Sequence, residues 1–175
     1  MDNQNINLTI DGTKVSVKKG TTILEAARSI GVDIPTLCYL KEINEVGACR
    51  MCLVEVEGAR GYIASCVAQA EDGMVVKTNT PGLIDTKKTI LELLLSAHEK
   101  RCLTCSRNQN CDLQRLAKKF GIEDIKFEGD MPEKTLDTSS KCIVRNTAKC
   151  ILCKRCVNVC KKVQGVAAIE TMGRG

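Results

Sequence analysis

Cysteine spacing constrains this chain more than any other feature of its sequence. Twelve of the 175 residues are cysteines, and eleven of the twelve fall into three separated sets. Each set contains a Cys-x-x-Cys pair, a spacing that brings two thiolates from one tight loop to a single centre. Disulfides, zinc sites or iron–sulfur clusters are therefore expected to hold this chain together, in addition to apolar burial.

The N-terminal segment helps to decide between these uses of cysteine, because disulfides belong to secreted chains. The sequence begins MDNQNINLTI, which has neither the basic region nor the apolar stretch of a signal peptide. The longest apolar runs are also far too short to span a membrane. We therefore expect a cytoplasmic protein without membrane insertion, in which cysteine clusters bind metal.

Charge and composition argue against one class of partner. Lys and Arg number 26 against 21 for Asp and Glu, but they are spread along the chain. Aromatic residues make up only 2% of the sequence, so the stacking side chains of single-strand nucleic-acid binders are missing. We expect no nucleic-acid partner. Basic residues around the last cysteine set, such as Lys154 and Arg155, are expected to form a solvated face, with a docking patch as the alternative.

The first part of the chain shows strand patterns. Apolar residues alternate over residues 6–10, and Asp11-Gly12 predicts a hairpin turn to a return strand. Two later strands are expected, at residues 53–56 and 74–76. A hairpin followed by a helix and later strands is typical of a small β-grasp sheet.

The sequence also contains signals for three helices. Thr22 and Glu25 form a capping box, which predicts a helix that ends at Gly31. Asp85 is a candidate cap for a second helix, whose apolar face leads to the only histidine of the chain. A third helix is predicted over residues 112–120. The expected fold class is α+β, with four segments: a β-grasp domain (1–80), a small helical domain (81–121), a linker (122–140) and a partial bacterial-ferredoxin-like segment (141–175).

The first cysteine set consists of Cys38, Cys49, Cys52 and Cys66. Its Cys-x-x-Cys pair lies among small residues, where backbone N–H groups can approach sulfur. A four-cysteine zinc site is the alternative, but zinc ribbons usually have two such pairs and this set has one. The pattern favours a [2Fe–2S] cluster.

The second set is His98, Cys102, Cys105 and Cys111. Three thiolates leave one position of a metal site open, and a neutral imidazole can fill it. Spacing alone leaves two interpretations, because one histidine with three cysteines is also an ordinary zinc ligand set.

The third set, Cys150, Cys153, Cys156 and Cys160, has the spacing of bacterial ferredoxins and predicts a [4Fe–4S] cluster. The proline that usually follows the fourth cysteine is absent, and there is no second run of the kind that two-cluster ferredoxins contain. The fourth ligand therefore stays open between Cys160 and Cys142. A structural thiol or a disulfide is the alternative for the cysteine left over.

Together, these motifs resemble one family over essentially the whole chain. The first cysteine set, residues 96–105 (SAHEKRCLTC) and residues 149–160 (KCILCKRCVNVC) are similar to the N-terminal iron–sulfur region shared by the large peripheral subunit of complex I and the multi-cluster [FeFe]-hydrogenases. The resemblance implies a [4Fe–4S] cluster, rather than zinc, at the second set. It thus implies one [2Fe–2S] and two [4Fe–4S] clusters.

The resemblance also implies a function. We expect an electron-relay subunit that carries electrons between a flavoprotein NAD(P)H-binding subunit and a second redox subunit, within a hetero-oligomeric complex. Short members that this chain resembles occur in electron-bifurcating transhydrogenase and formate dehydrogenase assemblies. The chain has no Gly-x-Gly-x-x-Gly fingerprint after a strand, so the subunit itself is expected to catalyse little. The alternatives are the truncated electron-input arm of an [FeFe]-hydrogenase and a zinc-binding interaction module.

Overall fold

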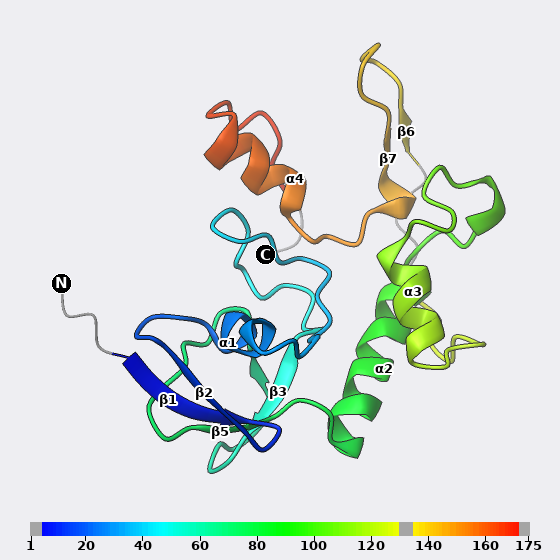
Figure 1. The fold of residues 1–175 in the computed structure, drawn as a ribbon. Coiled ribbons are helices and arrows are strands. Elements are labelled where there is room, and N and C mark those ends of the chain that lie inside the picture. The colour runs from blue at the N-terminus through cyan, green and yellow to red at the C-terminus, as the bar shows by residue number, and fades with distance from the viewer. Residues whose placement is uncertain (1–4, 130–134, 172–175) are drawn as a thin grey trace. The chain divides into compact units, whose positions relative to one another are not determined.

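The structure, a computed structural model, describes residues 5–129 and 135–171 of the chain (Figure 1). The chain divides into two units. The first comprises Met1–Lys87 and Lys154–Gly175, and the second comprises Lys88–Cys153. No helix in the described part is long and apolar enough to cross a membrane.

A five-stranded sheet with the order β2-β1-β5-β3-β4 forms the framework of the first unit. Strand β1 pairs parallel with β5, whereas β1–β2, β3–β5 and β3–β4 are antiparallel. The fold is therefore α+β with a β-grasp-like N-terminal sheet, as the sequence predicts. The strands are β1 (Asn5–Ile10), β2 (Thr13–Lys18), β3 (Leu53–Val56), β4 (Ile63–Ala64) and β5 (Val75–Lys77).

The N-terminal hairpin follows directly from its sequence. Ile6, Leu8 and Ile10 are buried on one face of β1 because side chains alternate across a strand. Asp11 and Gly12 both have positive φ, 48° and 83°. That geometry is what a two-residue type I′ hairpin turn requires, so the predicted turn is confirmed.

Helix α1 (Ile23–Ser29) begins at the predicted capping residue. The Thr22 side chain accepts a hydrogen bond of 3.3 Å from the Glu25 backbone N–H. Gly31, with φ of 78°, follows the last turn. The helix buries Ile23, Leu24, Ala26 and Ala27 completely, which contributes to the apolar core of this unit.

Helix α2 (Pro81–Ser96) begins earlier than the sequence analysis expects. Thr80 accepts a 3.4 Å hydrogen bond from the Leu83 N–H, and Pro81 occupies the first helical position, where its missing N–H costs nothing. The expectation that Asp85 caps this helix is wrong, because the Thr-Pro pair caps it one turn earlier.

The remaining elements are short. Helix α3 (Asp112–Lys119) matches the prediction, and its Leu113 and Leu116 are buried. Strands β6 (Leu136–Asp137) and β7 (Arg145–Asn146) form a hairpin that the sequence analysis did not predict, and β6 lies inside the expected linker at 122–140. Residues 130–134 of that linker lie outside the described residues.

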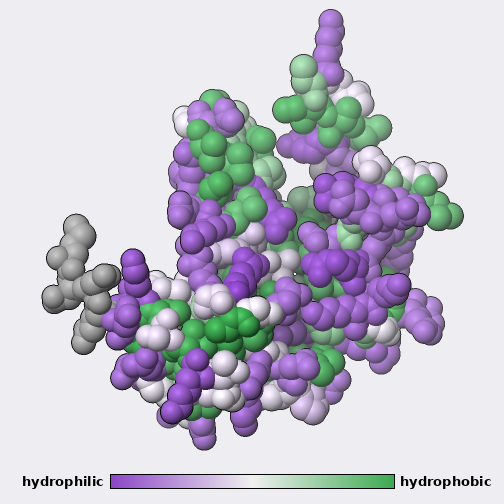
Figure 2. Space-filling view, in the orientation of Figure 1, coloured by the Kyte–Doolittle hydropathy of each residue, from purple (hydrophilic) through white to green (hydrophobic). Residues whose placement is uncertain are grey.

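Hydrophobic side chains are exposed over the β6–β7 hairpin (Figure 2). They are Leu136, Ile143 and Val144.

Candidate metal centres

The structure brings the four cysteines of the first set together in the first unit. Cys38 lies after α1, Cys49 and Cys52 lie before β3, and Cys66 lies after β4. Each of the four is at most 6% exposed. The Cys38 thiol shares hydrogen bonds with Cys49 and Cys66, and Cys52 shares one with Cys66. Four sulfurs that are far apart in sequence therefore converge in one buried place.

These contacts separate the four thiols into acidic and weakly acidic groups. Hydrogen bonds from Cys49 and then Cys66 lower the pKa of Cys38 to about 2. A hydrogen bond from Cys66 lowers the pKa of Cys52 to about 6. The pKa values of Cys49 and Cys66 are raised, first of all by their bonds to Cys38. Two sulfurs are thus stabilised as thiolates, the form that binds metal, by the protons of the other two.

Backbone N–H groups also point at this sulfur cluster. The Leu37 N–H donates to the Cys49 Sγ at 3.4 Å. The Cys38 sulfur accepts from the backbone of Ala48 and Cys49, which follow Gly47. Gly47 has φ of 62°, a conformation that glycine adopts readily and that turns the loop around the sulfurs. Hydrogen bonds of this kind tune the potential of a bound cluster.

The second set surrounds a cavity of about 190 Å³ in the second unit. His98 follows α2, Cys102 begins a short 3₁₀ helix, and Cys111 is the N-cap of α3. Together with Cys105, these residues line the cavity, and its wall also includes the apolar residues Leu95, Leu113, Ala117 and Ile125. All four predicted ligands of this set therefore lie around one space.

Burial favours the neutral form of His98. Its pKa is lowered, first of all by burial, so the imidazole is neutral at neutral pH. Neutral imidazole is the metal-binding form of histidine. Soft thiolates, one neutral imidazole and an apolar wall suit an iron–sulfur cluster.

Within residues 5–129 and 135–171, no group of three or more Cys, His, Asp or Glu side chains is arranged to hold one metal ion.

The third set is divided between the two units. Cys150 and Cys153 belong to the second unit, and Cys156 and Cys160 belong to the first. The Cys150 Sγ accepts the Leu152 N–H at 3.4 Å, and the Cys160 Sγ accepts the Ala168 N–H at 3.2 Å. These N–H···S bonds are the kind that thiolate ligands accept.

Cys142 is the cysteine outside this pattern. It is exposed in the loop between β6 and β7. All twelve cysteines lie in the described part of the chain, and none of them forms a disulfide. The expected alternative of a disulfide for the leftover cysteine is therefore absent from this structure.

Sequence reasoning missed one set of residues near the first site. Arg155, expected on a solvated face, donates hydrogen bonds to the backbone carbonyls of Cys38 and Tyr39. Asn158 donates to Asn44 in the same loop. No local signal could reveal these contacts, because 117 residues separate Arg155 from Cys38.

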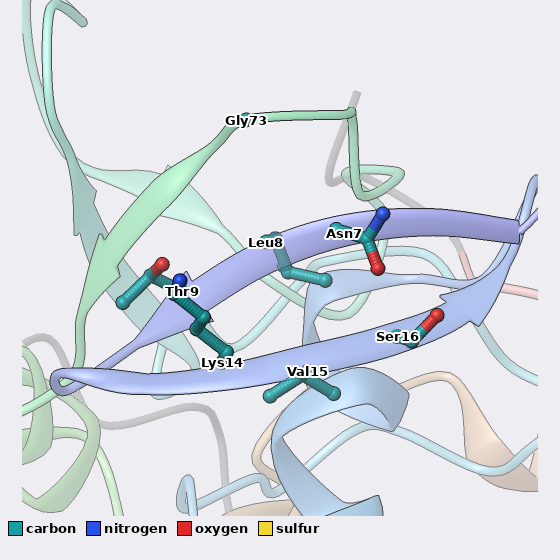
Figure 3. Close-up of a pocket in the computed structure, with 7 residues that line it drawn as sticks. All are labelled: Asn7, Leu8, Thr9, Lys14, Val15, Ser16 and Gly73. Carbon is teal, nitrogen blue, oxygen red and sulfur yellow. The ribbon is translucent and has the colours of Figure 1, made fainter.

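A separate hollow of about 490 Å³ lies over the β1–β2 hairpin (Figure 3). Its lining includes Asn7, Thr9, Lys14 and Ser16, and it contains neither cysteine nor histidine. It therefore lacks the ligand chemistry of the three sets.

A β-grasp sheet with buried cysteines in its loops, followed by a small helical region around a cavity lined by three cysteines and a histidine, defines an iron–sulfur protein. Residues 3–81 match the family described as a 2Fe-2S iron-sulfur cluster binding domain. Residues 87–126 match the NADH-ubiquinone oxidoreductase-G iron-sulfur binding region.

Individual relatives agree with these matches. The chain is 43% identical to the NADP-reducing hydrogenase subunit HndD of Solidesulfovibrio fructosivorans, over 97% of this chain and 30% of that protein. It is 38% identical to the NADH-ubiquinone oxidoreductase 75 kDa subunit of Reclinomonas americana, over 97% of this chain and 25% of that protein. The chain thus spans less than a third of the length of these relatives.

A solved structure matches this chain over a larger share of its own length. A chain of an NAD+-reducing [NiFe]-hydrogenase, in the H2-reduced state, superposes with a TM-score of 0.90 at 32% identity, over 97% of this chain and 71% of that one. The present chain therefore belongs to the family of iron–sulfur regions shared by the large peripheral subunit of complex I and NAD(P)-linked hydrogenases. The family expected from the cysteine motifs is confirmed.

Proposed function

We propose that this chain is an electron-relay subunit that passes electrons between a flavin-containing, NAD(P)H-oxidising partner and another redox module. The observation that carries the proposal is the convergence of Cys38, Cys49, Cys52 and Cys66 in a buried place, with backbone N–H groups directed at the sulfurs. Burial and N–H···S bonds are the means by which a protein sets a cluster's potential.

We assign the ligands from the contacts of the first set and from the spacing of the other two. In a [2Fe–2S] cluster four thiolates serve two irons, two for each iron. The contacts run from Cys49 to Cys38, from Cys38 to Cys66 and from Cys66 to Cys52, and this continuous set supports the four cysteines as the ligands of one such cluster. For the two proposed [4Fe–4S] clusters the ligands are His98, Cys102, Cys105 and Cys111, and then Cys150, Cys153, Cys156 and either Cys160 or Cys142.

Each bound cluster would supply one-electron redox chemistry. This chain's own residues exclude water at the first set, where the cysteines are nearly inaccessible. They also set the charge at the second set. His98 replaces a thiolate there, which makes the site one unit less negative and favours reduction.

The names of two relatives support a proposal about the partners. HndD is by name a subunit of an NADP-reducing hydrogenase, and the Reclinomonas relative is by name a subunit of an NADH-ubiquinone oxidoreductase. We therefore propose a hetero-oligomeric, cytoplasmic complex with an NAD(P)H-binding flavoprotein and a second redox subunit. The electron-input arm of a hydrogenase is the second candidate, because the 43% identity to HndD covers only 30% of that protein.

Metal analysis tests the proposal. The chain purified without oxygen should be brown and contain about ten irons, from one two-iron and two four-iron clusters. Cys52→Ser should lose the [2Fe–2S] signal in electron paramagnetic resonance after reduction, while retaining the [4Fe–4S] signals. A colourless protein that contains zinc in place of iron would refute the proposal.

The partners need a separate experiment. Reduction of the chain by NADH or NADPH should require added flavoprotein subunit from the same complex. Reduction by either nucleotide without that subunit would contradict the relay role.

A further inference from the structure

The short helix that carries Cys156 contacts the loop of the first cysteine set within the first unit. Arg155 begins this helix, α4 (Arg155–Asn158), and its Nε donates to the backbone carbonyl of Cys38 at 3.2 Å. Its Nη2 donates to the carbonyl of Tyr39, also at 3.2 Å. One planar guanidinium therefore holds two consecutive carbonyls, a geometry that suits arginine and not lysine.

A buried asparagine supports the same loop. Asn44 is 0% exposed, and its Nδ2 donates to the Cys38 carbonyl at 2.6 Å. Asn158, at the other end of α4, donates to the Oδ1 of Asn44. The Cys38 carbonyl thus accepts two side-chain hydrogen bonds, and one of the two donors, on Arg155, carries a positive charge.

The aromatic residue in this loop is fixed by a second arginine. The Arg28 guanidinium lies 5.1 Å from the centre of the Tyr39 ring, and the Tyr39 hydroxyl donates to Glu25 at 3.1 Å. The ring is therefore held by α1 while its carbonyl is held by Arg155. The backbone that leads away from Cys38 is restrained on both sides.

A positive charge beside the Cys38 loop affects the reduction potential of a cluster bound there. Reduction of a cluster adds one negative charge, and a nearby positive charge stabilises the reduced form. Arginine keeps its proton throughout the usual pH range. Arg155 is only partly exposed, so its charge is screened less than that of a fully solvated side chain.

We propose that Arg155 is a positioning residue for the [2Fe–2S] cluster, an inference that rests on the function proposed above. Its guanidinium fixes the Cys38–Tyr39 backbone and raises the reduction potential of the cluster. The same contact holds the start of α4, and with it Cys156, against the Cys38 loop. A residue of the last cysteine motif thereby tunes the first site.

The test is a redox titration of the full chain, monitored by electron paramagnetic resonance. In Arg155→Gln the ratio of reduced to oxidised [2Fe–2S] cluster at a fixed potential should fall about tenfold, which corresponds to about 59 mV for a one-electron couple. Arg155→Lys keeps the charge but cannot hold both carbonyls as a fork, so its shift should be smaller. Lys154→Gln, the control, removes the same charge one residue earlier and should shift the ratio by less than half as much.

Each outcome decides the question. An unchanged potential in Arg155→Gln, or equal shifts in Arg155→Gln and Lys154→Gln, would overturn the inference while the proposed function stands. If Arg155→Gln loses its cluster, Arg155→Lys carries the test, because a potential equal to that of the unaltered chain would show that the two-carbonyl contact is not needed. Absence of a [2Fe–2S] signal from the unaltered chain would instead refute the proposed function.

Discussion

The backbone N–H of Leu37 donates a hydrogen bond to the Sγ of Cys49 at 3.4 Å. The two residues are 12 positions apart, so the loop between them folds back to bring a peptide dipole to a sulfur. Such bonds stabilise a thiolate and the metal bound to it. The conformation of the loop therefore matters as much as the cysteines it carries.

Gly47→Ala should disturb the first cysteine site, while it lowers the free energy of unfolding only modestly. Gly47 has φ of 62°, and an added Cβ would lie 3.5 Å from Val67, an ordinary contact. The substitution should cost about 1–2 kcal/mol of stability from backbone strain alone. Because the strained backbone is next to the Cys38 and Cys49 sulfurs, the [2Fe–2S] potential should shift as well.

Gly58→Ala is the matched control for that variant. Gly58 also has a positive φ, 83°, and a Cβ added there would meet nothing within 4 Å, but this glycine belongs to the turn after β3. Thermal unfolding should show a similar loss of stability in both variants. A potential that shifts equally in both, or in neither, would contradict a specific role of the Gly47 loop.

His98→Cys should lower the potential of one [4Fe–4S] cluster. A thiolate adds one negative charge in place of neutral imidazole, so the reduced form becomes less favourable by an amount on the order of 100 mV. A redox titration should find the [2Fe–2S] potential unchanged. Lys118→Gln, a charge change on an exposed residue of α3 that does not line the cavity, should have a much smaller effect. Unaltered potentials in His98→Cys would remove His98 from the ligands.

Two serine variants test which cysteine is the fourth ligand of the last cluster. Cys160→Ser should lose up to four irons, because Cys160 completes the ferredoxin spacing and its sulfur already accepts the Ala168 N–H. Cys142→Ser, on an exposed loop, should keep all of them. Iron analysis checks both. Loss of iron from Cys142→Ser alone would make Cys142 the fourth ligand in place of Cys160. Full retention of iron in both variants would show that another atom completes the site.

Iron removal should affect the two units unequally. Ile10 and Leu24 are fully buried in the sheet–helix core of the first unit, and burial of such apolar side chains should stabilise the sheet without iron. Around His98 the chain is largely irregular and its apolar cavity would be left open. Hydrogen exchange of the iron-free chain should therefore show lost protection at residues 98–111 and retained protection in β1. Equal losses in both regions would contradict this expectation.

Elements with local causes were predictable from the sequence. The Asp11-Gly12 turn and the Thr22 cap depend on neighbouring residues, and both occur where expected. The start of α2 was missed although Thr80 and Pro81 are also a local signal. The two-residue strands β4 and β6 are too short to show a pattern of alternation.

The sequence by itself determined the family and the grouping of cysteines, because ligand spacing within a loop is a local property that survives in the linear chain. Tertiary structure alone decided which distant groups meet. The contacts of Cys38 with Cys66, of His98 with the cavity wall, and of Arg155 with the Cys38 carbonyl depend on how strands and helices pack. Such contacts have no signature in the sequence, since burial and hydrogen bonding between segments far apart depend on the whole fold.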